Sequence, residues 1–168
     1  MLVEIILGRD TGDAALAAAL EGVLGCALPR LPNTCTAAPG PLKVLWLGPD
    51  EYLVITPDGR EAPVAQALRK AAGGAWAAVV ELGCGQTVIE LEGPRAREIL
   101  AKGCPLDLHP RVFGPGRCAQ SRLARSLVTI VQVEAGPRFE LIVRRSFADY
   151  LWQWLVDASA CEVTPAYV

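Results

Sequence analysis

A stretch that occurs twice in related form decides the fold of this chain. Residues 47–71 read LGPDEYLVITPDGREAPVAQALRKA, and residues 135–158 read AGPRFELIVRRSFADYLWQWLVDA. Each copy starts with a Gly-Pro turn, continues into a strand led by an aromatic residue and ends in a helical segment. The repeat predicts one α+β domain over residues 1–168 with two related halves, about 1–83 and 84–168.

Around the first copy, the N-terminal half predicts the order βαββαβ. Strands are expected at 2–7, 42–47, 51–57 and 76–82. Asp13 is suited to cap a helix that runs to about Gly25, because its side chain can accept hydrogen bonds from first-turn amides. A second helix is expected from Glu61 to Ala72, before Gly73-Gly74. The proline-rich residues 26–41 are expected to form a loop.

Around the second copy, the C-terminal half predicts a similar order. The segment QTVIELE at 86–92 alternates as a half-buried strand does. Pro94 suits the first position of a helix that ends at Gly103. Strands follow near 119–123, 127–133 and 139–143, then a helix from Ser146, and residues 161–168 could add an edge strand. The expected fold is therefore two βαββα-type, ferredoxin-like halves packed as one unit.

The composition favours a compact protein with surface to spare for a partner. Hydrophobic residues make up 52 % of the chain and charged residues 20 %, which argues against disorder. No start resembling a signal peptide and no apolar run of roughly 18 residues occurs, so a cytoplasmic protein without a membrane partner is expected. Residues 95–145 are basic, but few aromatics lie among their arginines, which disfavours nucleic acid.

The sequence lacks the common catalytic motifs. No dinucleotide fingerprint, P-loop or nucleophile elbow is present, and the six cysteines form no C-x-x-C pair, so they are expected to be small buried hydrophobes. His109, the only histidine, lies between Cys104 and Cys118, which leaves a Cys–His pair or a metal site as weaker alternatives. The flanking prolines favour a stiff loop with His109 as a polar anchor. We expect no catalytic, cofactor-binding or metal-binding residue in this chain.

The final helix carries more apolar surface than one buried face requires. Asp149, Gln153 and Asp157 form a polar stripe, while apolar side chains cover most of the rest. The helix is either enclosed within its own domain or presents Trp152 to another chain.

Arg144 and Arg145 precede this helix, next to its N-terminus, where the partial positive charge of the helix dipole does not stabilise a cation. They would gain from a facing acidic surface, or they could pair internally with Asp149 or Glu140. We treat five residues as a candidate subunit interface: His109, Arg144, Arg145, Tyr150 and Trp152.

Two long segments resemble a known family. REILAKGCPLDLHPRVFGPGRCAQSRLA at 97–124 and FELIVRRSFADYLWQWLVDA at 139–158 resemble the gamma subunit of heterotetrameric sarcosine oxidase, with support from LWLGPDEYLVITP and TVIELEGPRA earlier in the chain. The resemblance covers about residues 42–158. It implies a fold similar to the folate-binding domain of aminomethyltransferases and a non-catalytic, structural subunit.

The resemblance also implies partners and cofactors outside this chain. Such complexes contain alpha, beta, gamma and delta subunits and convert sarcosine to glycine, with hydrogen peroxide and formaldehyde or methylene-tetrahydrofolate as products. FAD, FMN and NAD are expected in the alpha and beta subunits and zinc in delta. Glu81 and Gly83 replace an aspartate and a serine of related chains, so an N-methylglutamate dehydrogenase complex is an alternative. A folate-dependent aminomethyltransferase-like domain is another, but residues 124–133 offer it no carboxylate.

Overall fold

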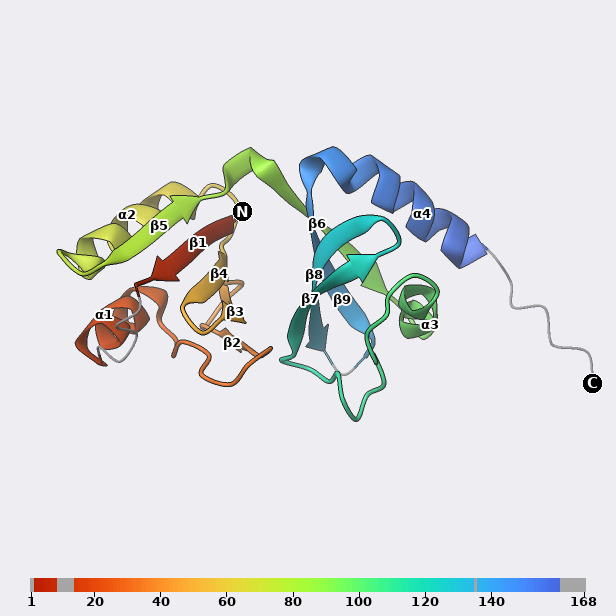
Figure 1. Ribbon diagram of the computed structural model, residues 1–168, viewed down its shortest axis with the longest axis horizontal. Helices are drawn as coiled ribbons and strands as arrows, with labels where there is room; N and C mark the ends of the chain where they lie inside the picture. Colours follow the sequence, from red (N-terminus) through yellow and green to blue (C-terminus); the bar gives the residue numbers. More distant parts are fainter. Residues whose placement is uncertain (1, 9–13, 135, 161–168) are drawn as a thin grey trace, which may run out of the picture. The chain divides into compact units, whose positions relative to one another are not determined.

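The computed structural model describes residues 2–8, 14–134 and 136–160, without the side chains of residues 84 and 134. These residues form two compact units (Figure 1). The first comprises Met1–Gln86 with Gly116–Ala119, and the second comprises Thr87–Pro115 with Gln120–Val168. In the described part of the chain, no helix has the length and apolar character needed to cross a membrane.

The first unit is a five-stranded sheet with two helices. Its elements are β1 (Leu2–Leu7), α1 (Ala14–Leu24), β2 (Cys35–Ala37), β3 (Lys43–Gly48), β4 (Glu51–Ile55), α2 (Glu61–Ala72) and β5 (Ala77–Glu81). The strand order is β2-β3-β4-β1-β5, and β1 pairs antiparallel with both β4 and β5. Without β2, this is the order of a ferredoxin-like βαββαβ unit.

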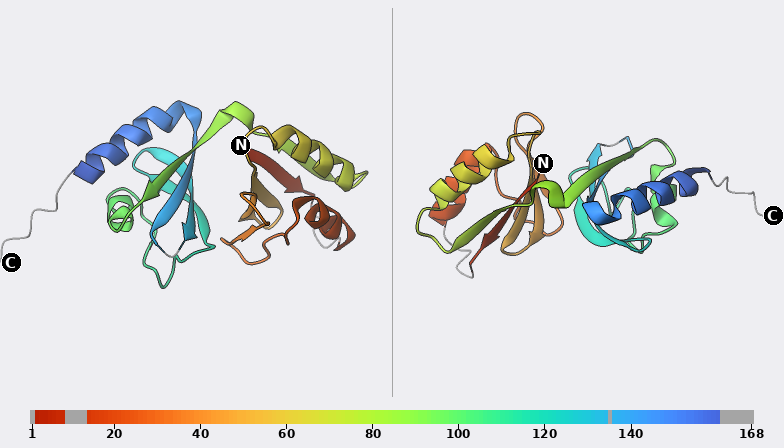
Figure 2. Two further views of the ribbon diagram at one scale, coloured as in Figure 1. Left: turned by 180° about the vertical axis from the view of Figure 1, so that it is seen from behind. Right: turned by 90° about the horizontal axis from the view of Figure 1, so that it is seen from above.

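Both helices cover the same face of the first sheet, as Figures 1 and 2 show. The side chains of Val3, Ile5 and Leu7 point to this face, because alternate residues of a strand share a side. They pack in one apolar cluster with buried residues of both helices, among them Leu20 and Leu68. The opposite face of this sheet therefore carries Glu4 and Ile6 of β1 together with their partners in β5, Val80 and Ala78.

The second unit repeats the strand order of the first, without a counterpart of β5 in its four-stranded sheet. Its elements are β6 (Gln86–Glu92), α3 (Ala96–Ala101), β7 (Cys118–Leu123), β8 (Ser126–Glu134), β9 (Arg138–Arg144) and α4 (Ala148–Ala160), with a short 3₁₀ turn before β6 and another before α4. The order β6-β9-β8-β7 matches β1-β4-β3-β2 of the first unit. The repeat predicted from the sequence is thus confirmed in the strand order.

Several predicted boundaries are also confirmed. Helix α2 spans Glu61–Ala72 as expected, and Gly73 ends it with a φ of 57°, a conformation that side chains disfavour. The strands predicted at 2–7 and 86–92 are β1 and β6. The predicted cap at Asp13 and the predicted edge strand at 161–168 lie outside the described residues.

Three details differ from the prediction. Strand β2 lies inside the predicted loop 26–41, where it pairs with β3 and where the backbone N–H of Cys35 donates to the carbonyl of Gly116 at 2.8 Å. Helix α3 begins at Ala96 instead of Pro94, because residues 93–95 form a turn. Helix α4 begins at Ala148 instead of Ser146, after a 3₁₀ turn at Arg145–Phe147.

Candidate functional site

Helix α4 presents apolar side chains to solvent. Leu151, Leu155 and Ala158 form its buried stripe. Trp152, 57 % exposed, and Val156 lie one helical turn apart beside that stripe, and both are open to solvent. Tyr150 is exposed on another side of the helix. The apolar excess noted in the sequence therefore forms an external surface of this unit.

The arginines before α4 also point outward. Arg144 ends β9, Arg145 begins the 3₁₀ turn, and both side chains are exposed. Within residues 14–134 and 136–160, neither has an ion-pair partner, and the carboxylate of Asp149 accepts instead from the amide of Gln153 at 3.1 Å. Both guanidinium groups are therefore open to solvent.

Phe147 differs from what its spacing suggests. It lies four residues before Leu151, which would place it on the buried side of a continuous helix, but it is 42 % exposed. It belongs to the 3₁₀ turn at Arg145–Phe147, and the tighter geometry of a 3₁₀ turn changes the direction of its side chains. Phe147 therefore adds to the exposed apolar surface.

Lys102 and Gly103, in the family-like segment at 97–124, contact helix α4 and hold it in place. A Cβ placed on Gly103 would lie 2.6 Å from Cζ2 of Trp154, so only glycine allows the indole to pack this closely. The Nζ of Lys102 donates to the carbonyl of Ala158 in the last turn, where a positive charge is favourable to the helix dipole. The carbonyl of Gly103 accepts from the backbone N–H of Ala124 at 2.9 Å.

Arg97 anchors the loop between α3 and β7. Its guanidinium donates to the carbonyls of Leu108 and Phe113, the latter at 3.0 Å, and to the side-chain oxygen of Gln132 at 2.8 Å. It also lies 5.2 Å from the ring centre of Phe139, within the range of a cation–π contact. Burial lowers the pKa of Arg97. Sequence reasoning missed this residue, because nothing local distinguishes it from the other arginines.

His109 is an exposed residue that shapes the same loop. The ring Nδ1 of His109 accepts from the backbone N–H of Arg111 at 3.2 Å, and the backbone N–H of His109 donates to the carboxylate of Asp107 at 2.9 Å. Its carbonyl accepts from the N–H groups of Val112 and Phe113. The structure thus places His109 on the α3–β7 loop and the other four candidates on α4 or just before it.

The cysteines beside His109 have other partners. The thiol of Cys104 lies 3.7 Å from the hydroxyl of Ser121, and the thiol of Cys118 lies 3.2 Å from the carbonyl of Thr34. Burial, with a smaller effect from Cys35, raises the pKa of Cys118 to about 12, which keeps it an unreactive thiol. Among the described residues, no group of three or more potential ligands could hold a metal ion.

The fold of the chain is found in solved structures. It aligns with the aminomethyltransferase T of the glycine cleavage system from Bartonella henselae at a TM-score of 0.69, over 94 % of this chain and 43 % of that one. The identity is 16 %, so this likeness concerns the fold alone. The fold class predicted from the sequence, an α+β domain similar to the folate-binding domain of aminomethyltransferases, is confirmed.

Closer relatives identify the family. A chain of the heterotetrameric sarcosine oxidase from Corynebacterium sp. U-96 aligns at a TM-score of 0.85 and 31 % identity, over 96 % of this chain and 82 % of that one. The sarcosine oxidase subunit gamma of an Arthrobacter species is 39 % identical over 89 % of this chain and 70 % of its own length. That of Corynebacterium sp. strain U-96 is 36 % identical over 92 % and 74 %. The model of the "Sarcosine oxidase, gamma subunit family" matches residues 8–161, and the chain belongs to this family.

Proposed function

We propose that this chain is the non-catalytic, structural gamma subunit of a heterotetrameric sarcosine oxidase. The observation that carries the proposal is the exposed surface of α4. Gly103, in the family-like segment at 97–124, helps to hold this helix in place because it packs against Trp154. Membership of the gamma subunit family and the likeness to a chain of a heterotetrameric enzyme support it.

In this proposal the chemistry belongs to the partner subunits. The complex oxidises sarcosine to glycine, with hydrogen peroxide and formaldehyde or methylene-tetrahydrofolate as products. The alpha and beta subunits hold FAD, FMN and NAD, and the delta subunit holds zinc. This chain supplies a rigid surface to the complex, and that complex acts in the cytoplasm.

The proposed interface consists of His109, Arg144, Arg145, Tyr150 and Trp152. Tryptophan, tyrosine and arginine are the residue types most enriched among interface hot spots. Trp152 can fill an apolar pocket of the partner, while the two guanidinium groups can bind its carboxylates in bidentate fashion. His109 contributes through the loop whose shape it stabilises.

The test is a double variant of this surface, Trp152→Ala with Arg145→Glu. Loss of an interface tryptophan typically costs about 2 kcal/mol or more of binding, so we expect the variant subunit to fold but to leave the complex on size exclusion. The matched control is Leu127→Ala with Arg125→Glu, a pair in the same unit whose side chains are also exposed. If the double variant assembles as tightly as the control, helix α4 is not the interface.

A further inference from the structure

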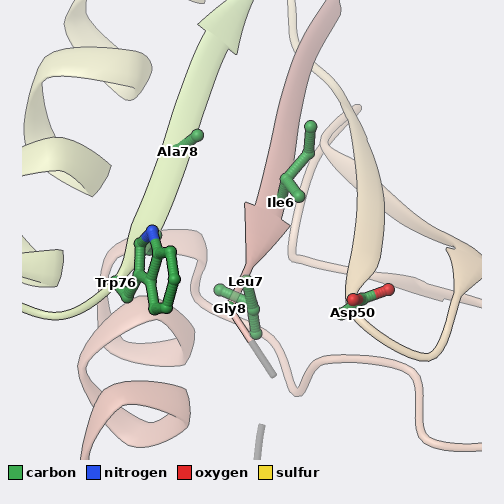
Figure 3. Close-up of a pocket in the computed structure, with 7 residues that line it drawn as sticks. Ile6, Leu7, Gly8, Asp50, Trp76 and Ala78 are labelled. Carbon is green, nitrogen blue, oxygen red and sulfur yellow. The ribbon is translucent and has the colours of Figure 1, made fainter. Parts of the chain in front are cut away.

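A groove of about 510 Å³ lies at one end of the first sheet, far in sequence from helix α4. It is lined by the end of β1, the start of β5 and the β3–β4 turn, through Ile6, Leu7, Gly8, Asp50, Trp76, Ala77 and Ala78. Figure 3 shows the indole of Trp76 beside Gly8 and Leu7, with Ile6 and Asp50 on the other side of β1. The described residues that line it all belong to the first unit.

The groove continues onto the sheet face that α1 and α2 do not cover. The strand register aligns Glu51, Ile6 and Ala78 in one row across β4, β1 and β5. The next row on the same face contains Glu4 and Val80. Ile6 and Val80 are each 41 % exposed and Trp76 is 89 % exposed, so apolar groups dominate the open surface here.

Trp76 is exposed but held at its backbone. Its carbonyl accepts from the N–H of Gly8 at 2.6 Å, and a Cβ on Gly8 would lie 2.8 Å from that carbonyl oxygen and 3.1 Å from the Cβ of Trp76. The N–H of Leu7 donates to the carbonyl of Asp50 at 2.7 Å, which fixes the opposite wall. A large aromatic side chain on a rigid support loses little entropy when a partner binds it.

The charged rim of the groove is acidic. Asp50 lines it, and Glu51 and Glu4 lie on the adjoining sheet face. Burial and the hydrogen bond and negative charge of Glu51 raise the pKa of Glu4. None of the described lining residues is basic, so a cation brought by a partner would relieve the repulsion between these carboxylates.

The edge of the same sheet is closed to strand addition at this position. The guanidinium of Arg69, on α2, donates to the carbonyl of Val79 at 3.1 Å and 3.0 Å and to the carboxylate of Glu81 at 2.9 Å. These hydrogen bonds occupy the carbonyl oxygen of Val79 on the outer edge of β5, which a strand added to this edge would need as a hydrogen-bond acceptor. A partner would therefore bind through side chains on the sheet face.

We propose that this groove is a second docking site, which receives a segment of a partner subunit that places an apolar side chain between Ile6 and Trp76 and an arginine or lysine beside Asp50. The proposal rests on the proposed function, because it requires that the chain assembles with larger subunits. The complementarity is that of an interface hot spot, an apolar anchor beside an opposite charge.

The test uses the full-length chain with an affinity tag, expressed together with the other subunits of its complex. Trp76→Ala is compared with Leu127→Ala, and Asp50→Lys with Glu92→Lys; both controls alter exposed residues outside the groove. We expect each groove variant to bind the flavin-carrying subunits at least about 10-fold more weakly than the matched control. Binding equal to the control would overturn the proposal.

Two further readouts keep the outcomes distinct. If the wild-type chain recovers no flavin-carrying subunit, the proposed function fails, whereas recovery that is insensitive to the groove variants contradicts this inference alone. Hydroxyl-radical labelling of the wild-type chain needs no variant to fold. Trp76 should be labelled strongly in the free chain and several-fold less in the complex, and equal labelling would also overturn the proposal.

Discussion

The replacement of Gly103 by alanine tests whether this residue helps to hold helix α4 in place. The new Cβ would lie 2.6 Å from Cζ2 and 2.8 Å from Cη2 of Trp154, and 3.1 Å from the backbone nitrogen of Ala124. Carbon atoms in good contact are about 3.5–4.0 Å apart, so the indole must move by about 1 Å. The Ala124 nitrogen cannot yield easily, because it donates to the Gly103 carbonyl at 2.9 Å.

The expected change in the free energy of unfolding on Gly103→Ala is the sum of two opposing effects. Overpacking of this kind typically costs about 1–3 kcal/mol. Alanine also lowers the entropy of the unfolded chain, which returns about 0.4–1 kcal/mol where the native φ is compatible. Gly103 is not among the glycines with positive φ. We therefore expect Gly103→Ala to lower the free energy of unfolding by about 1–2 kcal/mol.

The assay is urea unfolding in a double-mutant cycle with Trp154→Leu. A leucine at position 154 removes the ring that meets the new Cβ, so Gly103→Ala should then cost clearly less, with only the 3.1 Å approach to the Ala124 nitrogen remaining. Gly22→Ala serves as a control, because a Cβ there meets nothing within 4 Å and the residue lies within α1. An equal cost of Gly103→Ala in both backgrounds would refute the reasoning, as would a gain in stability like that expected for Gly22→Ala.

Four further outcomes are expected. Arg97→Met should lower the free energy of unfolding by about 2–3 kcal/mol and expose the α3–β7 loop to proteolysis, because three hydrogen-bond acceptors lose their donor; Arg97→Lys should restore only part of this. Burial raises the pKa of Cys118 from 9.0 to about 12, so the free energy of unfolding should fall as the pH rises from 9 to 12. Cys118→Ala should make the free energy of unfolding less dependent on pH in this range, as measured by urea unfolding at a series of pH values. Gly8→Ala should lower the thermal midpoint, since its Cβ meets the Trp76 carbonyl oxygen at 2.8 Å; an unchanged midpoint would contradict that contact. The isolated chain should show no flavin absorbance, no sarcosine oxidation and no micromolar tetrahydrofolate binding in calorimetry, and any of these would contradict a purely structural role.

The fold was predictable from the sequence largely because it is repeated. The two copies of the turn–strand–helix pattern lie at β4–α2 and β9–α4, which occupy equivalent places in the two strand orders. Periodic apolar residues and the glycines after α2 supplied the boundaries. Strand β2 was missed because it is short, lies among prolines and depends on pairing with β3 and with the distant Gly116, which local patterns do not report.

The candidate surface was predictable only in part. The excess of apolar residues on α4 is visible in the sequence, and the exposure of Trp152 agrees with it. The supports of that surface were not visible. Gly103 was expected only to end a helix, yet it also receives the ring of Trp154, and Arg97 reaches acceptors up to 35 residues away. The groove at Trp76 was missed for the same reason, since β1, β5 and the β3–β4 turn come together only in the folded sheet.

The most direct test of the central claim is purification of this chain, with an affinity tag, from its native host under mild conditions. Mass spectrometry and absorbance spectroscopy then identify what remains bound to it. The account predicts that larger subunits carrying flavin, together with a small zinc-containing subunit, elute with the chain in equal stoichiometry and that the mixture oxidises sarcosine. A chain that elutes without any flavoprotein would contradict its role as a subunit of such a complex.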